Sequence, residues 1–241
     1  ISNSASQAHN EAEKFGNVLE HWTGETLASR VCGLDDLLGH TRVMQGSIGT
    51  LKSQLDESKR EIEQLRVEVK KAREEALSDG LTGLINRKGF DLALAACLGH
   101  CTDDTQGPSL FIADIDHFKR VNDTYGHLLG DKVIRAIARI LGENIKGRDV
   151  AARFGGEEFV VLLPDTPLEG ACQLAEKIRT TVEKLSIKRT DKNEAISNIT
   201  ISFGVASYRK GEHMSAFVAR ADNALYQSKN GGRNRVTADE D

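Results

Sequence analysis

The sequence predicts an α/β (α+β) domain built on a mixed central sheet flanked by helices, preceded by an all-α coiled-coil segment. Three observations lead to this fold class. All three prolines follow residue 100, so no proline breaks a helix in the first hundred residues. After residue 79, apolar runs typical of strands alternate with helical patterns. Two of those runs flank a Gly-Gly turn, which predicts an antiparallel pair within the sheet.

Residues 1–46 are predicted to form an irregular helical regulatory segment. Its apolar residues fall into two stripes displaced in phase, and several glycines weaken a regular helix. The expected object is a broken helix or a helical hairpin. Two interpretations of Trp22 are open. It either packs within this segment or its dimer, or forms a docking surface for another protein. We expect a regulatory protein, or a neighbouring copy, to bind this segment.

Residues 47–78 are predicted to form a parallel dimeric coiled-coil stalk. Apolar and small residues recur at alternating spacings of three and four from residue 48 to residue 76: Ile48, Leu51, Leu55, Ser58, Ile62, Leu65, Val69, Ala72 and Ala76. β-Branched residues at position a with Leu at d favour two parallel strands. The flanking charges would pair Glu61 with Arg66 and Glu68 with Arg73 across the dimer. The alternative is a monomeric amphipathic helix lying on the domain.

Residues 79–241 are predicted to alternate helices and strands around one sheet. Asn86 is a plausible N-cap for a helix that continues to His100. The segment from residue 115 to residue 130 is expected to be a loop. The other expected elements are strands at 109–114, 149–152, 159–163, 198–207 and 234–237, and helices at 131–144, 167–185 and 215–230.

The stretch from Arg153 to Phe159 reads Arg-Phe-Gly-Gly-Glu-Glu-Phe and predicts a hairpin with two carboxylates. Gly155 and Gly156 are expected to adopt positive φ at its tip. Glu157 and Glu158 would start the second strand and point to opposite faces. Taken alone, such a turn is equally well a solvated hairpin tip.

A second acidic strand end makes this stretch more informative. An apolar run ends at Asp114 and Asp116, and Lys119 lies in the segment that follows. Carboxylates on adjacent strand ends, with a lysine and backbone N–H groups nearby, are what Mg²⁺ and a triphosphate require.

These motifs, together with Asp79–Arg87 and Lys229–Arg235, resemble a GGDEF-family diguanylate cyclase in its GGEEF variant. The resemblance covers roughly residues 79–237. It implies the palm-like fold shared with nucleotidyl cyclases and polymerases. It also implies Mg-dependent condensation of two GTP into cyclic di-GMP and two pyrophosphates by a dimer of catalytic heads, with the stalk controlling activity. Residues 79–241 are therefore expected to be the GGDEF domain.

The resemblance implies metal ligands and catalytic groups at specific positions. Asp114, the Ile115 carbonyl and Glu157 would bind Mg²⁺, with Mn²⁺ as an alternative. Glu157 would also help to deprotonate the ribose 3′-hydroxyl. Glu158 would lie behind the metal or act as an additional ligand. For Asp116 we favour a structural role over that of an extra ligand.

The resemblance also implies the substrate contacts. Lys119 and the backbone N–H groups of His117 and Phe118 would hold the β- and γ-phosphates, beside Gly155 and Gly156. Lys229 and Arg233 would clamp the distal phosphates, although either could be an ordinary charge at a helix C-terminus. Asn122 and Asp131 would accept hydrogen bonds from guanine; the alternative for Asp131 is a helix N-cap.

One departure from the family concerns product inhibition. Many members carry Arg-x-x-Asp six residues before the first signature glycine, whereas this chain has Lys146-Gly147-Arg148-Asp149. Lysine lacks the planar fork with which arginine pairs with phosphate and stacks on guanine. The site of Lys146 and Asp149 is therefore expected to be degenerate, with weak or absent product inhibition.

Composition limits the remaining classes. The net charge of −4 and the absence of a basic run argue against nucleic-acid and membrane partners. The four cysteines lack paired metal-ligand spacing and are expected to be reduced thiols. No run of 18 apolar residues occurs, so a cytoplasmic protein is expected. Two alternative functions are a non-catalytic GTP- or cyclic-di-GMP-binding module on a coiled-coil scaffold, and a purely structural coil protein.

Overall fold

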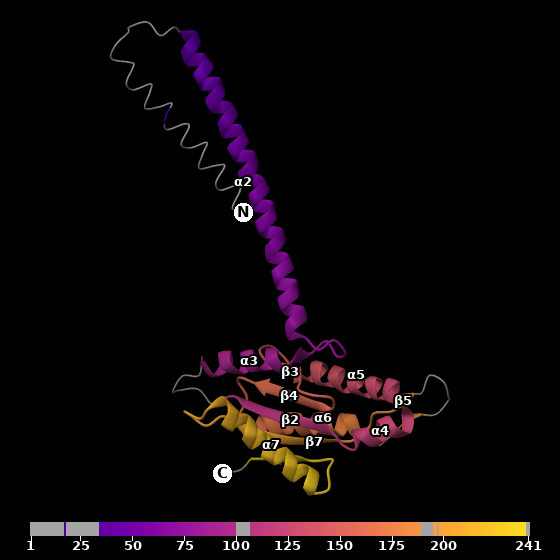
Figure 1. Cartoon of the computed structure of the whole chain (residues 1–241). Helices are drawn as coiled ribbons and strands as arrows, with labels where there is room; N and C mark the ends of the chain where they lie inside the picture. The colour runs from indigo at the N-terminus through magenta and orange to yellow at the C-terminus, as the bar shows by residue number, and fades with distance from the viewer. Residues whose placement is uncertain (1–16, 18–33, 100–106, 189–194, 197, 240–241) are drawn as a thin grey trace. The chain divides into compact units, whose positions relative to one another are not determined.

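The computed structural model describes residue 17 and residues 34–99, 107–188, 195–196 and 198–239 (Figure 1). The chain divides into two compact units, residues 1–72 and residues 73–241, and each is described by itself. The predicted regulatory segment before residue 34, including Trp22, lies outside the described residues apart from Asn17. His100 at the predicted end of the first domain helix lies outside them as well.

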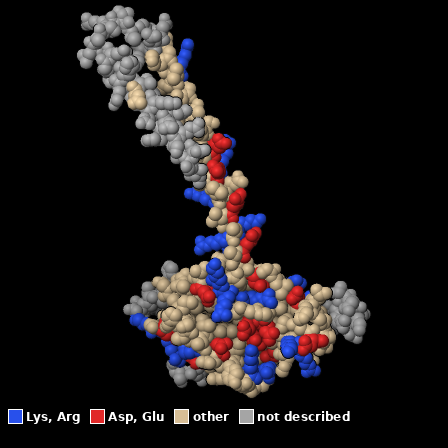
Figure 2. All heavy atoms as spheres, in the orientation of Figure 1, with Lys and Arg blue, Asp and Glu red and all other residues tan. Residues whose placement is uncertain are grey.

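Helix α2 runs without interruption from Leu34 to Leu77. It passes through Gly39, Gly46 and Gly49, so it crosses the predicted boundary at residue 46 without a break. The apolar residues of the heptad are exposed in the single chain; Ile48 is 53%, Leu55 54% and Ile62 47% exposed. Figure 2 shows acidic and basic side chains interspersed along this helix. An exposed apolar stripe flanked by charges of both signs is typical of a coiled-coil seam.

The second unit is built on a six-stranded mixed sheet with the order β1-β3-β4-β2-β7-β8. Its strands are β1 (Ile85–Asn86), β2 (Ser109–Ile115), β3 (Val150–Arg153), β4 (Glu158–Leu163), β7 (Ile201–Ser207) and β8 (Val236–Ala238). The pairs β1–β3 and β7–β8 are parallel, and the pairs β3–β4, β4–β2 and β2–β7 are antiparallel. The predicted mixed sheet is confirmed. A separate pair, β5 (Ile187–Lys188) and β6 (Ala195–Ile196), was not predicted.

Five helices accompany this sheet in the described part of the domain: α3 (Arg87–Gly99), α4 (Phe118–Tyr125), α5 (His127–Asn144), α6 (Leu168–Glu183) and α7 (Met214–Asn230). The N-cap predicted at Asn86 is confirmed, because its Oδ1 accepts a hydrogen bond from the Gly89 N–H at 3.0 Å.

The predicted loop between residues 115 and 130 is wrong. Helix α4 and the first turn of α5 occupy most of it. Phe118 is buried and Val121 packs against the same core cluster, so two apolar residues three apart are enough to dock this short, otherwise polar helix. Gly126, with φ 83°, permits the sharp change of direction between α4 and α5.

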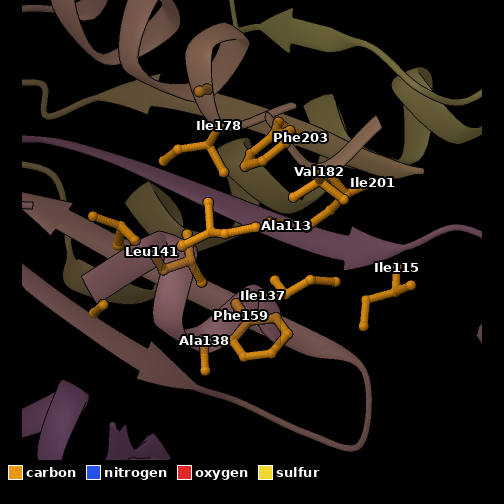
Figure 3. Close-up of a cluster of buried hydrophobic side chains, with 14 of the residues drawn as sticks. Ala113, Ile115, Ile137, Ala138, Leu141, Phe159, Ile178, Val182, Ile201 and Phe203 are labelled. Atoms are coloured by element: carbon orange, nitrogen blue, oxygen red, sulfur yellow. The ribbon is translucent and has the colours of Figure 1, made fainter. Parts of the chain in front are cut away.

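The core has one layer on each face of the sheet. From β2, Phe111, Ala113 and Ile115 join a cluster with α5 and α6 (Figure 3). Leu110 and Ile112 alternate with them and join a cluster with α3 and α7. Since side chains alternate along a strand, Asp114 is on the face that α7 covers.

Helix α7 approaches the sheet most closely at Gly204 in β7. A Cβ atom there would lie 2.0 Å from the Leu225 backbone nitrogen and 2.1 Å from the Ala221 carbonyl oxygen. Only glycine allows this approach. The contact fixes α7 on the face of the sheet that carries Asp114, and its last turn carries Lys229.

Candidate active site

Asp114 lies near the end of β2 between two antiparallel neighbours. Its Cα partners are Glu158 on β4 and Ser202 on β7. The next residue, Ile115, donates its N–H to the Glu157 carbonyl oxygen at 3.3 Å. The acidic end of β2 and the acidic start of the hairpin strand are therefore adjacent, as the sequence analysis requires.

The Asp114 carboxyl is buried, with only 6% of the residue exposed. Burial raises its pKa above the ordinary value, and Asp116 adds to the rise, while the ammonium of Lys229 opposes it. Lys229 Nζ lies 2.8 Å from Asp114 Oδ2. Burial also raises the pKa of Glu157, which is raised further by the nearby charge of Asp114 and lowered by Lys229. The two carboxylates thus repel each other in a partly dehydrated place.

The β3–β4 hairpin differs in detail from the prediction. Neither Gly155 nor Gly156 lies in the left-handed region of φ, so the predicted reason for the two glycines is wrong. At Gly155 a Cβ atom would lie 3.0 Å from Glu158 Oε2, which is a tight contact. Strand β4 begins at Glu158, and Glu157 lies in the bend before it, so strand alternation does not set the direction of the Glu157 side chain.

Arg153 braces the hairpin from inside the domain. Its Nη2 donates to the Gly156 carbonyl oxygen at 2.8 Å, and its Nη1 lies 3.1 Å from Asp79 Oδ1. Asp79 also accepts hydrogen bonds from the Thr82 backbone N–H and hydroxyl at 3.0 and 2.6 Å. Desolvation would raise the pKa of Asp79, but the bonds from Thr82 and Arg153 outweigh it and lower the pKa. The start of the domain is thereby tied to the tip of the hairpin.

Two cationic residues come from the C-terminal end of α7 and the segment after it. Lys229, in the last turn, forms the ion pair with Asp114. Arg233 has φ 63°, and its charge acts on Asp114 as well, lowering the pKa of that carboxyl. Lys229 therefore contacts the acidic site directly, and the charge of Arg233 acts on it.

The start of α4 brings together three further predicted residues. His117 is the N-cap and adopts a left-handed conformation with φ 56° and ψ 30°. Phe118 is buried, whereas His117 and Lys119 are exposed. The Arg120 N–H donates to the His117 carbonyl oxygen at 2.9 Å. The N–H groups at the very start of a helix lack an intrahelical acceptor and are suited to binding a phosphate.

Asn122 and Asp131 lie on the packed helices α4 and α5. Asn122 Oδ1 is buried and accepts no hydrogen bond within the described residues. A Cβ atom at Gly130 would lie 1.9 Å from this oxygen, so a larger residue there would displace the Asn122 amide. Asp131 is half-buried and lies inside α5, whose N-cap is Gly126; the N-cap alternative for Asp131 is therefore wrong. An unsatisfied buried acceptor next to a half-buried carboxylate suits a ligand with N–H donors.

Lys146 and Asp149 form a tight turn between α5 and β3. Asp149 Oδ2 accepts a hydrogen bond from the Lys146 backbone N–H at 2.9 Å, and Gly147 has φ 59°. The neighbouring Arg148 lies 3.4 Å from Asp165, with both side chains exposed. The turn therefore occupies the Asp149 carboxylate with the backbone.

The donor set at Asp114 fits a hard divalent cation. Mg²⁺ is held by one or two carboxylates plus substrate phosphates rather than by an all-protein cage. Two repelling carboxylates and the Ile115 carbonyl match that pattern, and the Lys229 ammonium already lies against one of them. Within the described ranges no group of three or more His, Cys, Asp or Glu side chains is arranged to hold a metal.

Acidic groups from a strand end and a hairpin thus lie beside Lys229 of the last helix and the charge of Arg233 just after it. The chain belongs to the GGDEF family of diguanylate cyclases: residues 76–235 match the family described as "Diguanylate cyclase, GGDEF domain". None of the described helices is long and apolar enough to cross a bilayer.

Similar proteins cover both parts of the chain. Diguanylate cyclase VdcA of Vibrio cholerae is 37% identical over 98% of this chain and 71% of its own length; for several other relatives the chain spans less than half of their length. The coiled coil and GGDEF domain of DgcB from Caulobacter crescentus, solved with c-di-GMP, is 41% identical with a TM-score of 0.73, covering 78% of this chain and 99% of that one. Diguanylate cyclase SiaD from Pseudomonas aeruginosa, solved with its activator SiaC, is 31% identical with a TM-score of 0.68, covering 97% of this chain and 87% of that one. These likenesses confirm the predicted fold class.

Two residues of the site make contacts that sequence reasoning did not find. The partners of Arg153 and Asp116 are remote in sequence: Asp79 lies 74 positions from Arg153, and Asn234 lies 118 positions from Asp116. No spacing or periodicity connects such positions. Only the position of Arg153 next to the signature glycines could have marked it.

We predict that Glu157→Gln stabilises the cation-free protein at neutral pH. The raised pKa means that the charged form of Glu157 is disfavoured in the folded state, so ionisation costs stability above the folded pKa and costs nothing below the unfolded value of 4.5. In the presence of a chelator, the variant should melt at a higher temperature than the wild type at pH 7, and the two should melt alike below about pH 4.

Glu143→Gln is the matched control, because Glu143 is an exposed carboxyl on α5 and its replacement should not change the melting temperature. A Glu157→Gln variant that is less stable than the wild type at pH 7 would show that the repulsion described above is absent.

Proposed function

We propose that this chain condenses two GTP molecules into cyclic di-GMP and releases two pyrophosphates. The observation that carries the proposal is the convergence at Asp114: the carboxylates of Asp114 and Glu157 lie near each other, the charge of Lys229 acts on both, and the charge of Arg233 acts on Asp114. Membership of a family of diguanylate cyclases supports the same activity.

We propose Asp114, the Ile115 carbonyl and Glu157 as ligands of a divalent cation, Mg²⁺ with Mn²⁺ as the alternative. When bound, the cation would supply charge stabilisation to the phosphoryl oxygens. Glu158, the Cα partner of Asp114, is exposed and adds negative charge beside Glu157. We assign it a supporting role as an additional ligand or a group behind the metal.

We propose the following substrate contacts. Lys119 and the N–H groups of His117 and Phe118 are proposed to hold the β- and γ-phosphates, with Lys229 and Arg233 on the distal side. Gly155 and Gly156 leave room for the triphosphate along the hairpin. The unsatisfied Oδ1 of Asn122 and the carboxylate of Asp131 are proposed to accept hydrogen bonds from the guanine amino group and N1–H.

The chemistry is an attack by the ribose 3′-hydroxyl of one GTP on the α-phosphorus of the other. A bond forms between O3′ and Pα, the bond from Pα to the bridging oxygen breaks, and pyrophosphate leaves. Glu157 is proposed to take the proton of the 3′-hydroxyl, a task for which a raised pKa is suitable. Each head holds one GTP, so two heads are needed for one product.

We predict that the wild-type protein releases pyrophosphate from GTP with Mg²⁺ and forms cyclic di-GMP, and that Asp114→Asn lowers the rate at least about a hundredfold. Loss of a metal ligand removes several kcal/mol of transition-state stabilisation. Coupled pyrophosphate detection and chromatography of the product measure both.

Asp165→Asn, which changes an exposed carboxylate in the turn after β4, serves as the control and should retain the wild-type rate. Wild-type protein that binds GTP without releasing pyrophosphate would instead be a non-catalytic nucleotide-binding module.

We predict that Asp131→Ala weakens GTP binding by about tenfold or more and ATP binding by less than about threefold. Loss of an acceptor for guanine N–H donors costs on the order of 1.5 kcal/mol, whereas adenine presents an acceptor at N1. Competition with a fluorescent nucleotide measures both affinities. Asp123→Ala, an exposed neighbour on α4, is the matched control. Equal losses for the two nucleotides would refute the assignment of Asp131.

The two heads are proposed to be brought together by a parallel coiled coil of residues 48–76 into a homodimer or higher homo-oligomer. The exposed heptad residues of α2 support this. DgcB, which resembles this chain over its coiled coil and GGDEF domain, supports the same arrangement of parts. We further propose that a regulatory protein binds residues 1–46 and controls activity through the stalk, since SiaD, similar over nearly the whole chain, is solved with an activator.

Two further proposals concern product inhibition and the location of the enzyme. The turn at Lys146 and Asp149 is proposed to give weak or absent product inhibition, because lysine replaces the arginine fork and the Asp149 carboxylate is engaged by the backbone. The use of GTP suggests that the enzyme acts in the cytoplasm, and we propose no nucleic-acid or membrane partner.

We predict that Leu55→Glu combined with Ile62→Glu yields a monomer with at least about tenfold lower cyclase activity, because charges in the seam prevent helix pairing. Deletion of residues 1–46 should also change oligomer size and activity. Light scattering and pyrophosphate release measure both properties.

Val67→Glu is the control, since Val67 is 59% exposed but lies off the heptad seam and its replacement should leave the dimer intact. A dimer that survives the double substitution would reject the coil, and unchanged size and activity after the deletion would reject regulation through residues 1–46.

A further inference from the structure

Asp116 is a buried carboxylate whose acceptor capacity is largely used by the protein itself. The residue is 6% exposed. Its Oδ1 accepts a hydrogen bond from the Ser202 hydroxyl at 2.7 Å. Its Oδ2 accepts one from the Thr200 hydroxyl at 2.7 Å and one from the Asn234 backbone N–H at 3.0 Å. Ser202 in β7 and Thr200 just before β7 therefore fix the orientation of the carboxylate. The third hydrogen bond links it to the segment after α7.

That segment has an uncommon backbone conformation. Gly232, Arg233 and Asn234 have φ values of 112°, 63° and 47° in succession. Two consecutive residues other than glycine in the left-handed region are unfavourable and persist only where the surroundings hold them. The segment carries Arg233, whose charge acts on Asp114.

Asn234 is held from two sides. Its backbone N–H is bound by Asp116, which lies just beyond the end of β2. Its side chain accepts a hydrogen bond from Arg179 Nη1 at 2.7 Å and donates one to Glu183 Oε1 at 2.8 Å, both on α6. Of these three bonds, the one to Asp116 joins a buried carboxylate to the Asn234 backbone N–H. It connects Asn234 to the end of the strand that carries Asp114.

We propose that Asp116 is a positioning residue that holds Arg233 in place for the distal phosphates of the substrate. Asp116 does so by accepting the hydrogen bond from the Asn234 N–H. This bond fixes the position of Arg233 relative to Asp114, which precedes Asp116 by two residues at the end of β2. The proposal rests on the proposed function, in which Arg233 contacts the triphosphate. It predicts that the effect of Asp116 on nucleotide binding is transmitted by Arg233 and not by direct contact with a cation.

The test combines Asp116→Asn with Arg233→Ala in the full chain. Amide hydrogen exchange of residues 231–237 in the free protein reports the Asn234 bond without any nucleotide. The affinity for α,β-methylene GTP with Mg²⁺ reports its consequence. Asp116→Asn should speed exchange in this segment and weaken the analogue at least about tenfold, which corresponds to about 1.4 kcal/mol. In the Arg233→Ala background the same substitution should change the affinity less than about twofold.

Two results would overturn the proposal: unchanged exchange and affinity in Asp116→Asn, or an equal loss of affinity in both backgrounds. The second result would make Asp116 act independently of Arg233, for example on the cation. Asp165→Asn is the control and should change neither quantity. If Asp116→Asn fails to fold, Thr200→Val takes its place in the test. It removes one donor to Asp116 Oδ2 and should weaken binding of the analogue by about two- to tenfold. Failure of the proposed function differs from all of these, because the wild type itself would not bind the analogue.

Discussion

The antiparallel pairing of β2 with both β4 and β7 is the constraint on which the site depends. It fixes Asp114 opposite Glu158 on one side and Ser202 on the other. A shift of register by one residue would turn Asp114 into the layer packed against α5 and α6 and would move Phe111 to the other face. Core packing therefore secures the position of the acidic groups: the alternating apolar residues of β2 fill two hydrophobic layers at once.

In this arrangement, burial and mutual repulsion disfavour the ionised forms of two carboxyl groups. Asp114 is buried and Glu157 lies near it, and the pKa values of both are raised. The ion pair with Lys229 offsets part of this cost. A divalent cation with a triphosphate would offset more, so the site is poised for the ligand that it is proposed to bind. Such local instability is common where binding or catalysis takes place.

Much of the fold and of the site could be predicted from the sequence, because the informative patterns are local. The Asn86 cap, the apolar run of β2 and the two acidic strand ends each lie within a few residues, and the heptad repeats at a fixed spacing. The errors have physical causes. The polar segment 115–130 contains too few apolar residues to show helical periodicity, yet Phe118 and Val121 suffice to dock α4. Neither signature glycine has positive φ; a Cβ atom at Gly155 would crowd the end of the Glu158 side chain, whereas Gly156 has open space around it. The hydrogen bonds of Arg153 and Asp116 join residues far apart in the chain, so they emerged only from the tertiary structure.

The most direct test of the account is the position of the cation. Anomalous diffraction from crystals of the protein with Mn²⁺ and a non-reactive GTP analogue locates the metal without reference to activity. We predict an anomalous peak between the carboxylates of Asp114 and Glu157, within ligand distance of the Ile115 carbonyl oxygen, with Lys229 moved from Asp114 toward the phosphates. A peak bound elsewhere, with Lys229 still paired to Asp114, would contradict it.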